Sequence, residues 1–180
     1  MDGYYSDNEL IDLNISFGKN VLISRKTSIY TSNLEIGDNV RIDDFSILKG
    51  NIIIGSNVHI SSFCQLEGQQ DIELESFSGL SSRVSIYTQS DDYSGNFLTN
   101  PTVPDKYRNI IKGRVKLEKH VIVGTNSTIL PNVILKQGSA VGANSLVNKN
   151  LEEWTINVGT PAKKIKNRNN ELINFEKFIG

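Results

Sequence analysis

The stretch IGDNVRIDDFSILKGNIIIGSNVHISSFCQL, residues 36–66, decides the fold of this chain. An aliphatic residue stands at every sixth position of it: Ile36, Ile42, Leu48, Ile54, Ile60 and Leu66. An α-helix repeats every 3.6 residues and an ordinary strand every two, so a period of six fits neither well. A six-residue unit is better explained as one short strand followed by one turn. Three such units make a triangular coil of about 18 residues that covers the next coil, as in other solenoids.

The same spacing continues on both sides of this stretch after short slips of register. The further positions are Phe17, Ile23, Ile29, Leu74, Leu80, Ile86, Leu117, Val123, Ile129, Leu135, Val141 and Val147. All of these positions are aliphatic or Phe, although hydrophobic residues make up only 38% of the chain. The register is therefore a property of the sequence and does not depend on where the count begins.

The positions between the apolar residues also repeat. Glycine often follows the apolar residue directly, asparagine often stands three residues after it, and a small or β-branched residue stands four after it, as in IGDNV and IGSNV. Gly and Asn tolerate a positive φ, so they suit the corners of a coil. The apolar residue and the one four later are expected to point inward. Cys64 holds such an inward position, so we expect a structural thiol there.

IGDNV (36–40), IGSNV (54–58) and VGTNST (123–128) resemble the repeats of the hexapeptide-repeat acyltransferases, and the resemblance covers about residues 17–163. It implies an all-β fold, a left-handed parallel β-helix, which is an exception to the right-handed crossover rule. Counting the repeats predicts six coils. The expected organisation is an N-terminal segment or partial coil (1–16), the β-helix (17–158) with an external loop (88–113), and a C-terminal tail with a helix (159–180).

The external loop follows from one break in the period, because Ile86 and Leu117 are 31 positions apart instead of six. A long excursion from a compact solenoid is usually functional or disordered. This one is rich in side chains that suit polyol recognition, so we expect it to bind an acceptor. The expected substrate-binding residues are Asp92, Tyr93, Tyr107 and Arg108 in the loop, with Ser61, Ser82 and Arg83 in the coils before it.

The C-terminal tail leaves the repeat after Val158. Its segment GTPAKKI (159–165) is similar to the segment that closes the β-helix in acetyltransferases of the family. Leu172, Phe175 and Phe178 or Ile179 recur at helical spacing, which predicts an amphipathic helix. This helix is expected to cap the last coil or to pack on a neighbouring subunit.

Composition narrows the partners and the location. The chain has 19 basic and 20 acidic residues and a formal net charge of −1, which gives no reason to expect a nucleic acid or a membrane as a partner. Its single cysteine suits a reducing compartment, the N-terminal residues lack the features of a signal peptide, and no apolar run approaches the roughly 20 residues that span a bilayer. A cytoplasmic protein is the expectation.

The most informative departure from the family lies at the mouth of the loop. The resembling O-acetyltransferases use a histidine there to deprotonate the acceptor hydroxyl, and the matching position here is Asp91. An ordinary Asp has a pKa near 3.9 and is a weak base at pH 7, whereas a hydroxyl needs a base near neutrality. An amine is nucleophilic once neutral, and a carboxylate can hold it by a charge-assisted hydrogen bond. Asp91 therefore favours an amino-sugar acceptor.

Other candidates for the chemistry are weaker. Glu118, where the chain returns to the coil, is a possible second carboxylate, and the nearby His120 could replace the missing base or shuttle a proton. His59 and His120 each follow an inward residue by five positions, so we expect both rings to point outward. The γ-class carbonic anhydrases share the fold and bind zinc through three histidines. Only two histidines occur here, so no metal is expected.

The resemblance also implies acyl-CoA binding, in a groove between two subunits of a homotrimer. In the family the pantetheine runs along the backbone of the C-terminal coils, and the matching positions here are Thr125, Ala143, Asn148, Lys149, Thr160, Pro161, Ala162 and Lys163. Lys163, Lys164, Lys166 and Arg168 form a basic cluster that could pair with the phosphates of CoA.

These observations predict a homotrimeric N-acyltransferase that uses acetyl-CoA or another short acyl-CoA. The expected acceptor is a nucleotide-linked amino-deoxy sugar for surface polysaccharide. Two alternatives stay open: a sugar O-acetyltransferase with Asp91 or His120 as base, and a non-catalytic solenoid scaffold. A scaffold would need neither the loop nor the GTPAKK segment.

Overall fold

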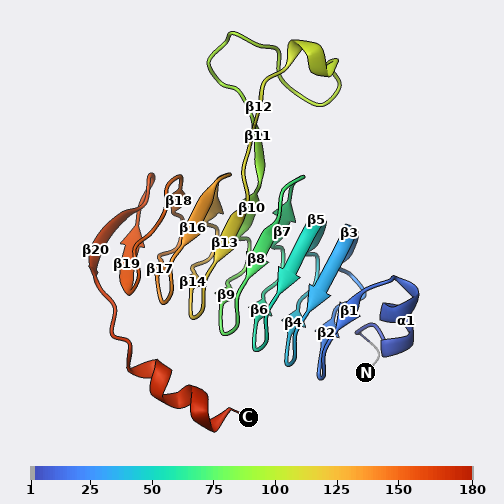
Figure 1. The fold of residues 1–180 in the computed structure, drawn as a ribbon, viewed down its shortest axis with the longest axis vertical. Helices are drawn as coiled ribbons and strands as arrows, with labels where there is room; N and C mark the ends of the chain where they lie inside the picture. Colours follow the sequence, from blue (N-terminus) through green and yellow to red (C-terminus); the bar gives the residue numbers. More distant parts are fainter. Residues whose placement is uncertain (1–2, 180) are drawn as a thin grey trace.

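The computed structural model describes residues 3–179, and residues 1, 2 and 180 at the ends of the two predicted terminal segments lie outside this range. The predicted fold is confirmed: the chain is a left-handed parallel β-helix with a loop that projects from its middle (Figure 1). Short strands form three faces that run the length of the solenoid, and the core lies between them.

Each face is a stack of strands from successive coils. The first face contains β1 (Ser16–Phe17), β8 (Ile72–Leu74), β13 (Val115–Leu117) and β16 (Val133–Leu135). The second face contains β2 (Leu22–Ile23), β4 (Arg41–Ile42), β6 (His59–Ile60), β9 (Gly79–Leu80), β14 (Ile122–Val123), β17 (Ala140–Val141) and β19 (Thr155–Val158). The third face contains β7 (Gln65–Glu67), β10 (Ser85–Tyr87), β15 (Thr128–Ile129) and β18 (Leu146–Val147). Two longer strands, β3 (Ser28–Ile36) and β5 (Ile47–Ile54), bend from the third face into the first.

The predicted inward register is confirmed. Of the apolar residues at six-residue spacing, all are buried except Phe17 and Ile29, which are partly buried and pack against the core. Parallel pairing places equivalent residues of successive coils over one another, as in Leu48, Leu66 and Ile86. Burying a side chain of this size contributes about 1.5–3 kcal/mol, so this axial column is the main source of stability.

The repeated Asn residues at the corners of the coil have a positive φ, as predicted from the sequence. Asn20, Asn39 and Asn57 have φ between 56° and 59°. Their side-chain amides hydrogen bond from coil to coil, over 3.0 Å from Asn20 to Asn39 and 3.3 Å from Asn39 to Asn57. The repeated asparagine therefore both allows the turn and links successive turns.

The solenoid has about seven turns, so the predicted count of six is wrong by one. The additional turn contains Leu151, which bridges to Leu135, and β19, which pairs with β17. Leu151 is followed by Glu152, Glu153 and Trp154, so the first corner of this turn has neither the Gly nor the Asn of the IGDNV repeat.

The N-terminal residues form a helix in place of the predicted partial coil. α1 (Asp7–Asp12) begins with a capping box, in which Glu9 accepts a hydrogen bond from the backbone N–H of Ser6. Its Leu10 is fully buried against the first coil. The helix thus covers the open end of the core (Figure 1).

The predicted external loop begins as a two-stranded stalk. β11 (Gln89–Asp91) pairs antiparallel with β12 (Ile110–Lys112), and the backbone N–H of Gly113 donates to the carbonyl of Thr88 at the root. Beyond the stalk lies a short 3₁₀ helix, η1 (Asp105–Tyr107). The stalk carries the loop head away from the solenoid (Figure 1).

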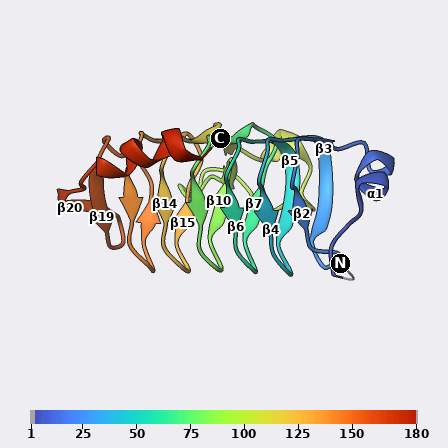
Figure 2. The ribbon, with the colours of Figure 1, turned by 90° about the horizontal axis from the view of Figure 1, so that it is seen from below.

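The tail forms a strand and then a 3₁₀ helix. β20 (Lys163–Asn167) turns back antiparallel to β19, and η2 (Glu171–Phe178) follows. η2 runs back along the outside of the solenoid and does not cap the last coil (Figure 2). Of the predicted apolar residues of this helix, Leu172 is half-buried, and Phe175, Phe178 and Ile179 stay exposed. Within residues 3–179, no helix is long and apolar enough to cross a membrane.

Candidate active site

The predicted site residues lie at three different corners of the coil. We call the corner where the loop leaves the coil, at Thr88 and Gly113, the loop corner. The serine corner, between the second and third faces, carries Ser61 and Ser82. The tail corner, between the first and second faces, carries His120 and is the corner where η2 docks. A single chain therefore does not bring Asp91, Ser82 and His120 into one site.

Asp91 lies at the end of β11, on the stalk of the loop. Its carboxylate accepts a hydrogen bond of 3.1 Å from the backbone N–H of Asn100 and lies 3.5 Å from the guanidinium of Arg108. Arg108 also pairs with Asp105 at 3.0 Å, and its side chain is only 11% exposed. The loop head thus folds back on Asp91. It contacts one side of the carboxylate and leaves the rest of the carboxylate open to solvent.

A cavity of about 250 Å³ adjoins Asp91 and Arg108, with Gln89 on its wall. The side-chain oxygen of Gln89 and the Nε of Arg108 are buried and have no hydrogen-bond partner among the described residues. Buried polar groups are normally paired, and an unpaired one is costly. The described residues therefore leave one acceptor and one donor unpaired beside this cavity. The sequence analysis missed Gln89 and Asn100, because only the fold of the loop places them beside Asp91.

The other predicted loop residues do not face this cavity. The carboxylate of Asp92 accepts hydrogen bonds from the backbone N–H of Ser94 and the amide of Asn109. Hydrogen bonding by the Ser94 side chain, then by its backbone N–H and by Asn109, holds the pKa of Asp92 below its usual range. Asp92 therefore shapes the loop. Tyr93 is 89% exposed and Tyr107 is half exposed on the loop head. They stay available to a partner that reaches the head.

The serine corner forms a second cavity, lined by Ser61, Ser82 and Thr125. The hydroxyls of Ser61 and Ser82 are 2.9 Å apart, and the Thr125 hydroxyl donates to the carbonyl of Ser82 over 2.6 Å. Thr125 was predicted to bind the donor and the two serines the acceptor, so this corner brings together residues from both predicted sets. His59 also lines the cavity, and its ring is exposed as predicted, 2.8 Å from Asp43.

His120 points out of the apolar core, as predicted, but its ring is buried and not exposed to solvent. Its side chain is only 5% exposed and its Nε2 lies 2.5 Å from the carboxylate of Glu176 in η2. The ring stacks on Phe77 with a centroid distance of 5.2 Å, and Trp154 lies on the other side. The reason is the tail, which returns over this corner and covers the ring. This position argues against His120 as the catalytic base.

Glu118 also lies near the tail corner, apart from Asp91. Its carboxylate accepts a 2.9 Å hydrogen bond from the backbone N–H of Gln137 in the next coil. Arg168, predicted to belong to a basic cluster, instead donates to the carbonyls of His120 and Gly138, and burial lowers its pKa. The Glu118 side chain therefore links two successive coils, and the Arg168 side chain links the tail to the solenoid.

Glu176 attaches η2 to the solenoid, and its removal should release the helix. Hydrogen bonds from His120 and Lys119 hold the pKa of Glu176 below its ordinary value of 4.5. The attachment is therefore complete above about pH 4.5 and is lost as the pH falls through the lowered pKa. We expect Glu176→Gln to change the fluorescence of Trp154, the only tryptophan, at pH 7, and the wild type to show that change only in acid.

Glu171→Gln is the matched control for this prediction. Glu171 begins the same helix and is exposed, and its carboxylate makes no hydrogen bond or ion pair with the described residues. An identical spectrum for Glu176→Gln and Glu171→Gln would contradict the assignment of Glu176 as the anchor.

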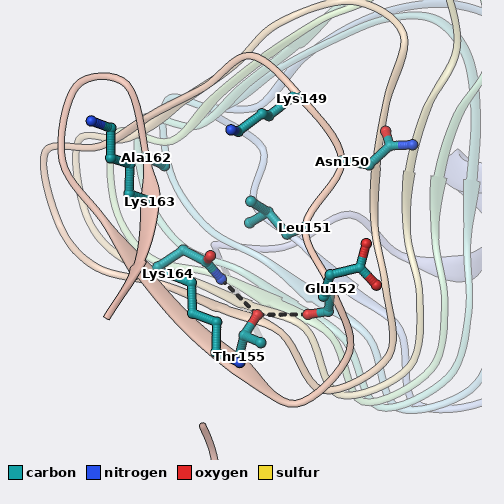
Figure 3. A pocket seen from close by; sticks show the side chains of 9 residues that line it. Lys149, Asn150, Leu151, Glu152, Thr155, Ala162, Lys163 and Lys164 are labelled. Carbon is teal, nitrogen blue, oxygen red and sulfur yellow. Dashed lines mark hydrogen bonds between the residues drawn. The ribbon is translucent and has the colours of Figure 1, made fainter. Parts of the chain in front are cut away.

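The predicted donor-binding residues form two groups. Thr125, Ala143 and Thr160 follow one another along the serine corner in successive coils, linked by a 2.9 Å hydrogen bond from the N–H of Asn144 to the carbonyl of Thr125. The others lie near the C-terminal end, where Lys149, Lys163 and Lys164 surround a cavity over Leu151 (Figure 3). Asn148, Pro161 and Lys166 do not line this cavity and are exposed.

Ala162 also borders this terminal cavity, but it is part of the core. Its side chain is buried and its N–H donates to the carbonyl of Leu146 over 2.8 Å, so its amide is not available to a ligand.

Cys64 is buried, as its inward position predicted. Its thiol donates to the carbonyl of Ser81 over 3.2 Å, and burial raises its pKa to about 11. The thiolate is the reactive form of cysteine, so this thiol is structural. Within residues 3–179, no three His, Cys, Asp or Glu side chains cluster as metal ligands.

Known proteins resemble this chain over nearly its whole length. Residues 33–68 match the family model described as bacterial transferase hexapeptide (six repeats). A dTDP-4-amino-4,6-dideoxy-D-glucose acyltransferase of Escherichia coli is 45% identical over 168 residues, which is 91% of this chain and 88% of that protein.

Solved structures agree with this. AntD, an N-acyltransferase from Bacillus cereus, is 45% identical, and one of its serine variants, in complex with dTDP-4-amino-4,6-dideoxyglucose and coenzyme A, superposes with a TM-score of 0.95 over 99% of this chain and 98% of that one. AntD in complex with dTDP and 3-hydroxybutyryl-CoA gives a TM-score of 0.94 over 99% and 97%. A maltose O-acetyltransferase from Clostridium difficile, 22% identical with a TM-score of 0.58, covering 91% of this chain and 75% of its own, shares the fold. The chain belongs to the hexapeptide-repeat family of acyltransferases.

Proposed function

We propose that this protein transfers an acyl group from a short acyl-CoA to the amine of a nucleotide-linked amino-deoxy sugar, with dTDP-4-amino-4,6-dideoxyglucose as the leading acceptor. The observation that carries the proposal is the carboxylate of Asp91 at the mouth of the loop, where the O-acetyltransferases have a histidine. The E. coli and B. cereus relatives, which act on or bind this sugar nucleotide, support the choice of acceptor.

In the proposed reaction, the neutral amine attacks the carbonyl carbon of the thioester. The C–N bond forms, the C–S bond breaks, and the sulfur leaves as the thiolate of CoA. The proton that the nitrogen loses passes to Asp91 or to water, and the products are an amide and CoA. No covalent enzyme intermediate is needed. Asp91 holds the amine in place, and Arg108 and the Asn100 N–H hold Asp91.

The spacing of two residues in AntD adds support for Asp91. AntD has been solved with a serine replaced at its position 84 and with an aspartate replaced at its position 94. In the present chain, Ser81 precedes Asp91 by the same ten positions, and Ser82 precedes Asp92 likewise. Asp91 is the better match in function, because it lines the cavity beside Arg108, whereas Asp92 does not line it and is bound by Ser94 and Asn109.

The separation of the corners supports a homotrimer as part of the proposal. Asp91 belongs to the loop corner and Ser82 to the serine corner, and β10 runs between them. A neighbouring subunit whose loop corner met this serine corner would complete the site. Donor binding along Thr125, Ala143 and Thr160, with phosphates near the lysines of β20, fits the same groove. We place the enzyme in the cytoplasm, where acyl-CoA is available, and its product in surface polysaccharide.

The proposal predicts CoA release that depends on an amine. With acetyl-CoA, we expect dTDP-4-amino-4,6-dideoxyglucose to release CoA and to gain an acyl group by mass spectrometry, and dTDP-glucose to do neither. A panel of acyl-CoA esters, including 3-hydroxybutyryl-CoA, would define the acyl chain. Release with a hydroxyl acceptor alone would establish an O-acetyltransferase instead. Failure to bind any acyl-CoA in calorimetry would leave only the scaffold.

A further inference from the structure

An exposed stack of aromatic and cationic side chains runs along the serine corner. It consists of Lys26, Phe45, Phe63 and Arg83, one from each of four successive coils, and we call it the aromatic ladder. The rings of Phe45 and Phe63 stack with centroids 5.1 Å apart and planes at 23°. The Nζ of Lys26 lies 5.3 Å from the centre of the Phe45 ring, and the guanidinium of Arg83 lies 5.3 Å from that of Phe63.

The backbone under the ladder is in a conformation that such residues avoid. Phe45, Phe63 and Arg83 have φ of 62°, 64° and 62°. Bulky residues rarely adopt this left-handed region, and strain of this kind collects at functional sites. In the two following C-terminal coils, the same corner position holds Asn126 and Asn144, which suit it. The fold by itself therefore favours Asn here.

A second aromatic stack shows what such residues do elsewhere in the chain. At the tail corner, Phe77, His120 and Trp154 also have positive φ, and Glu176 of η2 covers His120. At the serine corner, by contrast, Phe45 and Phe63 stay 50% and 49% exposed. The aromatic ladder thus presents a flat apolar surface that no described residue of this chain covers fully.

The neighbours of the ladder indicate its ligand. Phe63 and Arg83 directly follow the serine pairs that carry Ser61 and Ser82, so the ladder adjoins the cavity proposed for the acceptor. The proposed donor path leaves the same cavity in the opposite direction, along Thr125 and later coils. The part of the acceptor that extends away from the donor is its nucleotide.

We propose that the aromatic ladder binds the nucleotide of the acceptor: the pyrimidine stacks on Phe63 and Phe45, and Arg83 pairs with the diphosphate. This inference rests on the proposed function. Every nucleobase has a flat π face that can stack on aromatic side chains, and the guanidinium of arginine matches the geometry of a phosphate. Among the described residues, the guanidinium of Arg83 has no carboxylate partner, so it is available to an anion.

The test is calorimetry with dTDP and, separately, with CoA on the intact protein. Phe63→Asn should weaken dTDP binding by roughly tenfold to a hundredfold, which is the usual effect of losing one aromatic partner of a base. It should leave CoA binding and the mass of the assembly unchanged. Phe63→Tyr keeps the ring and should keep the affinity. Because Asn suits a positive φ, Phe63→Asn should be at least as heat-stable as the wild type, which excludes misfolding.

Each other outcome points to a different error. If the wild type binds dTDP and Phe63→Asn binds it equally well, the ladder is not the nucleotide site. If Phe63→Asn lowers the mass measured by light scattering, the ladder is a contact between copies of this chain, and the inference is overturned. If the wild type binds CoA but no dTDP, the proposed acceptor is wrong, and the inference falls with it.

Discussion

Asp91→Asn is expected to lower kcat/KM for the amino-sugar acceptor by about 100-fold to 10,000-fold, the range that a positioned proton acceptor contributes. The amide has the shape of the carboxylate but no charge and cannot take up the proton of the attacking amine. Affinity for acyl-CoA should not change, because the proposed donor path runs along other coils. The deficit should shrink as the pH rises, since hydroxide can then take up the proton that the nitrogen loses.

Asp105→Asn is the matched control for Asp91. Asp105 is the other carboxylate that contacts Arg108, at 3.0 Å, but its side chain is 92% exposed. Its loss perturbs Arg108 to a similar degree and leaves the proposed proton acceptor in place, so kcat/KM should stay close to that of the wild type. Asp91 would be removed from the mechanism if Asp91→Asn kept wild-type kcat/KM for the acceptor at every pH tested.

Gly50→Ala is expected to give the largest loss of stability among single methyl additions to the solenoid, about 2–5 kcal/mol. Gly50 has φ of 112°, and a Cβ there would lie 2.1 Å from the carbonyl oxygen of Gly68 in the next coil. Backbone of a packed coil cannot move aside without breaking the hydrogen bonds on either side of it. The free energy of unfolding from urea titration at a fixed protein concentration measures this loss.

Gly79→Ala provides the comparison within the same solenoid. The nearest atom to a Cβ at Gly79 is the Cδ1 of Ile122 at 3.4 Å, which is an ordinary contact with a flexible side chain. We expect a change of stability within about 0.5 kcal/mol, as for other substitutions that meet no special constraint. Equal stabilities for the two variants would contradict this prediction. They would show that the backbone at Gly50 shifts to accommodate a Cβ in spite of its close approach to Gly68.

The candidate site could be predicted in part from sequence. The break in the period located the loop, and alignment on Leu74, Leu80 and Ile86 placed Asp91 at its mouth. The partners of Asp91 could not be found in this way, because Asn100 and Arg108 reach it only through the fold of an aperiodic loop. His120 shows the same difficulty, since the residue that covers it, Glu176, is 56 positions away in a tail without repeats.

The sequence by itself determined the solenoid, its inward residues and the place of the loop. A six-residue repeat carries this information locally, because each unit makes the same strand, the same turn and the same inward contacts. Only the tertiary structure decided the seventh turn, the burial of His120, the aromatic ladder and the separation of the predicted site over three corners. These features arise from contacts between residues about 18 or more positions apart, as between Phe45 and Phe63, or from a segment that returns over an earlier coil. Such contacts depend on how the coils stack and where the tail docks, and the repeat itself leaves both open.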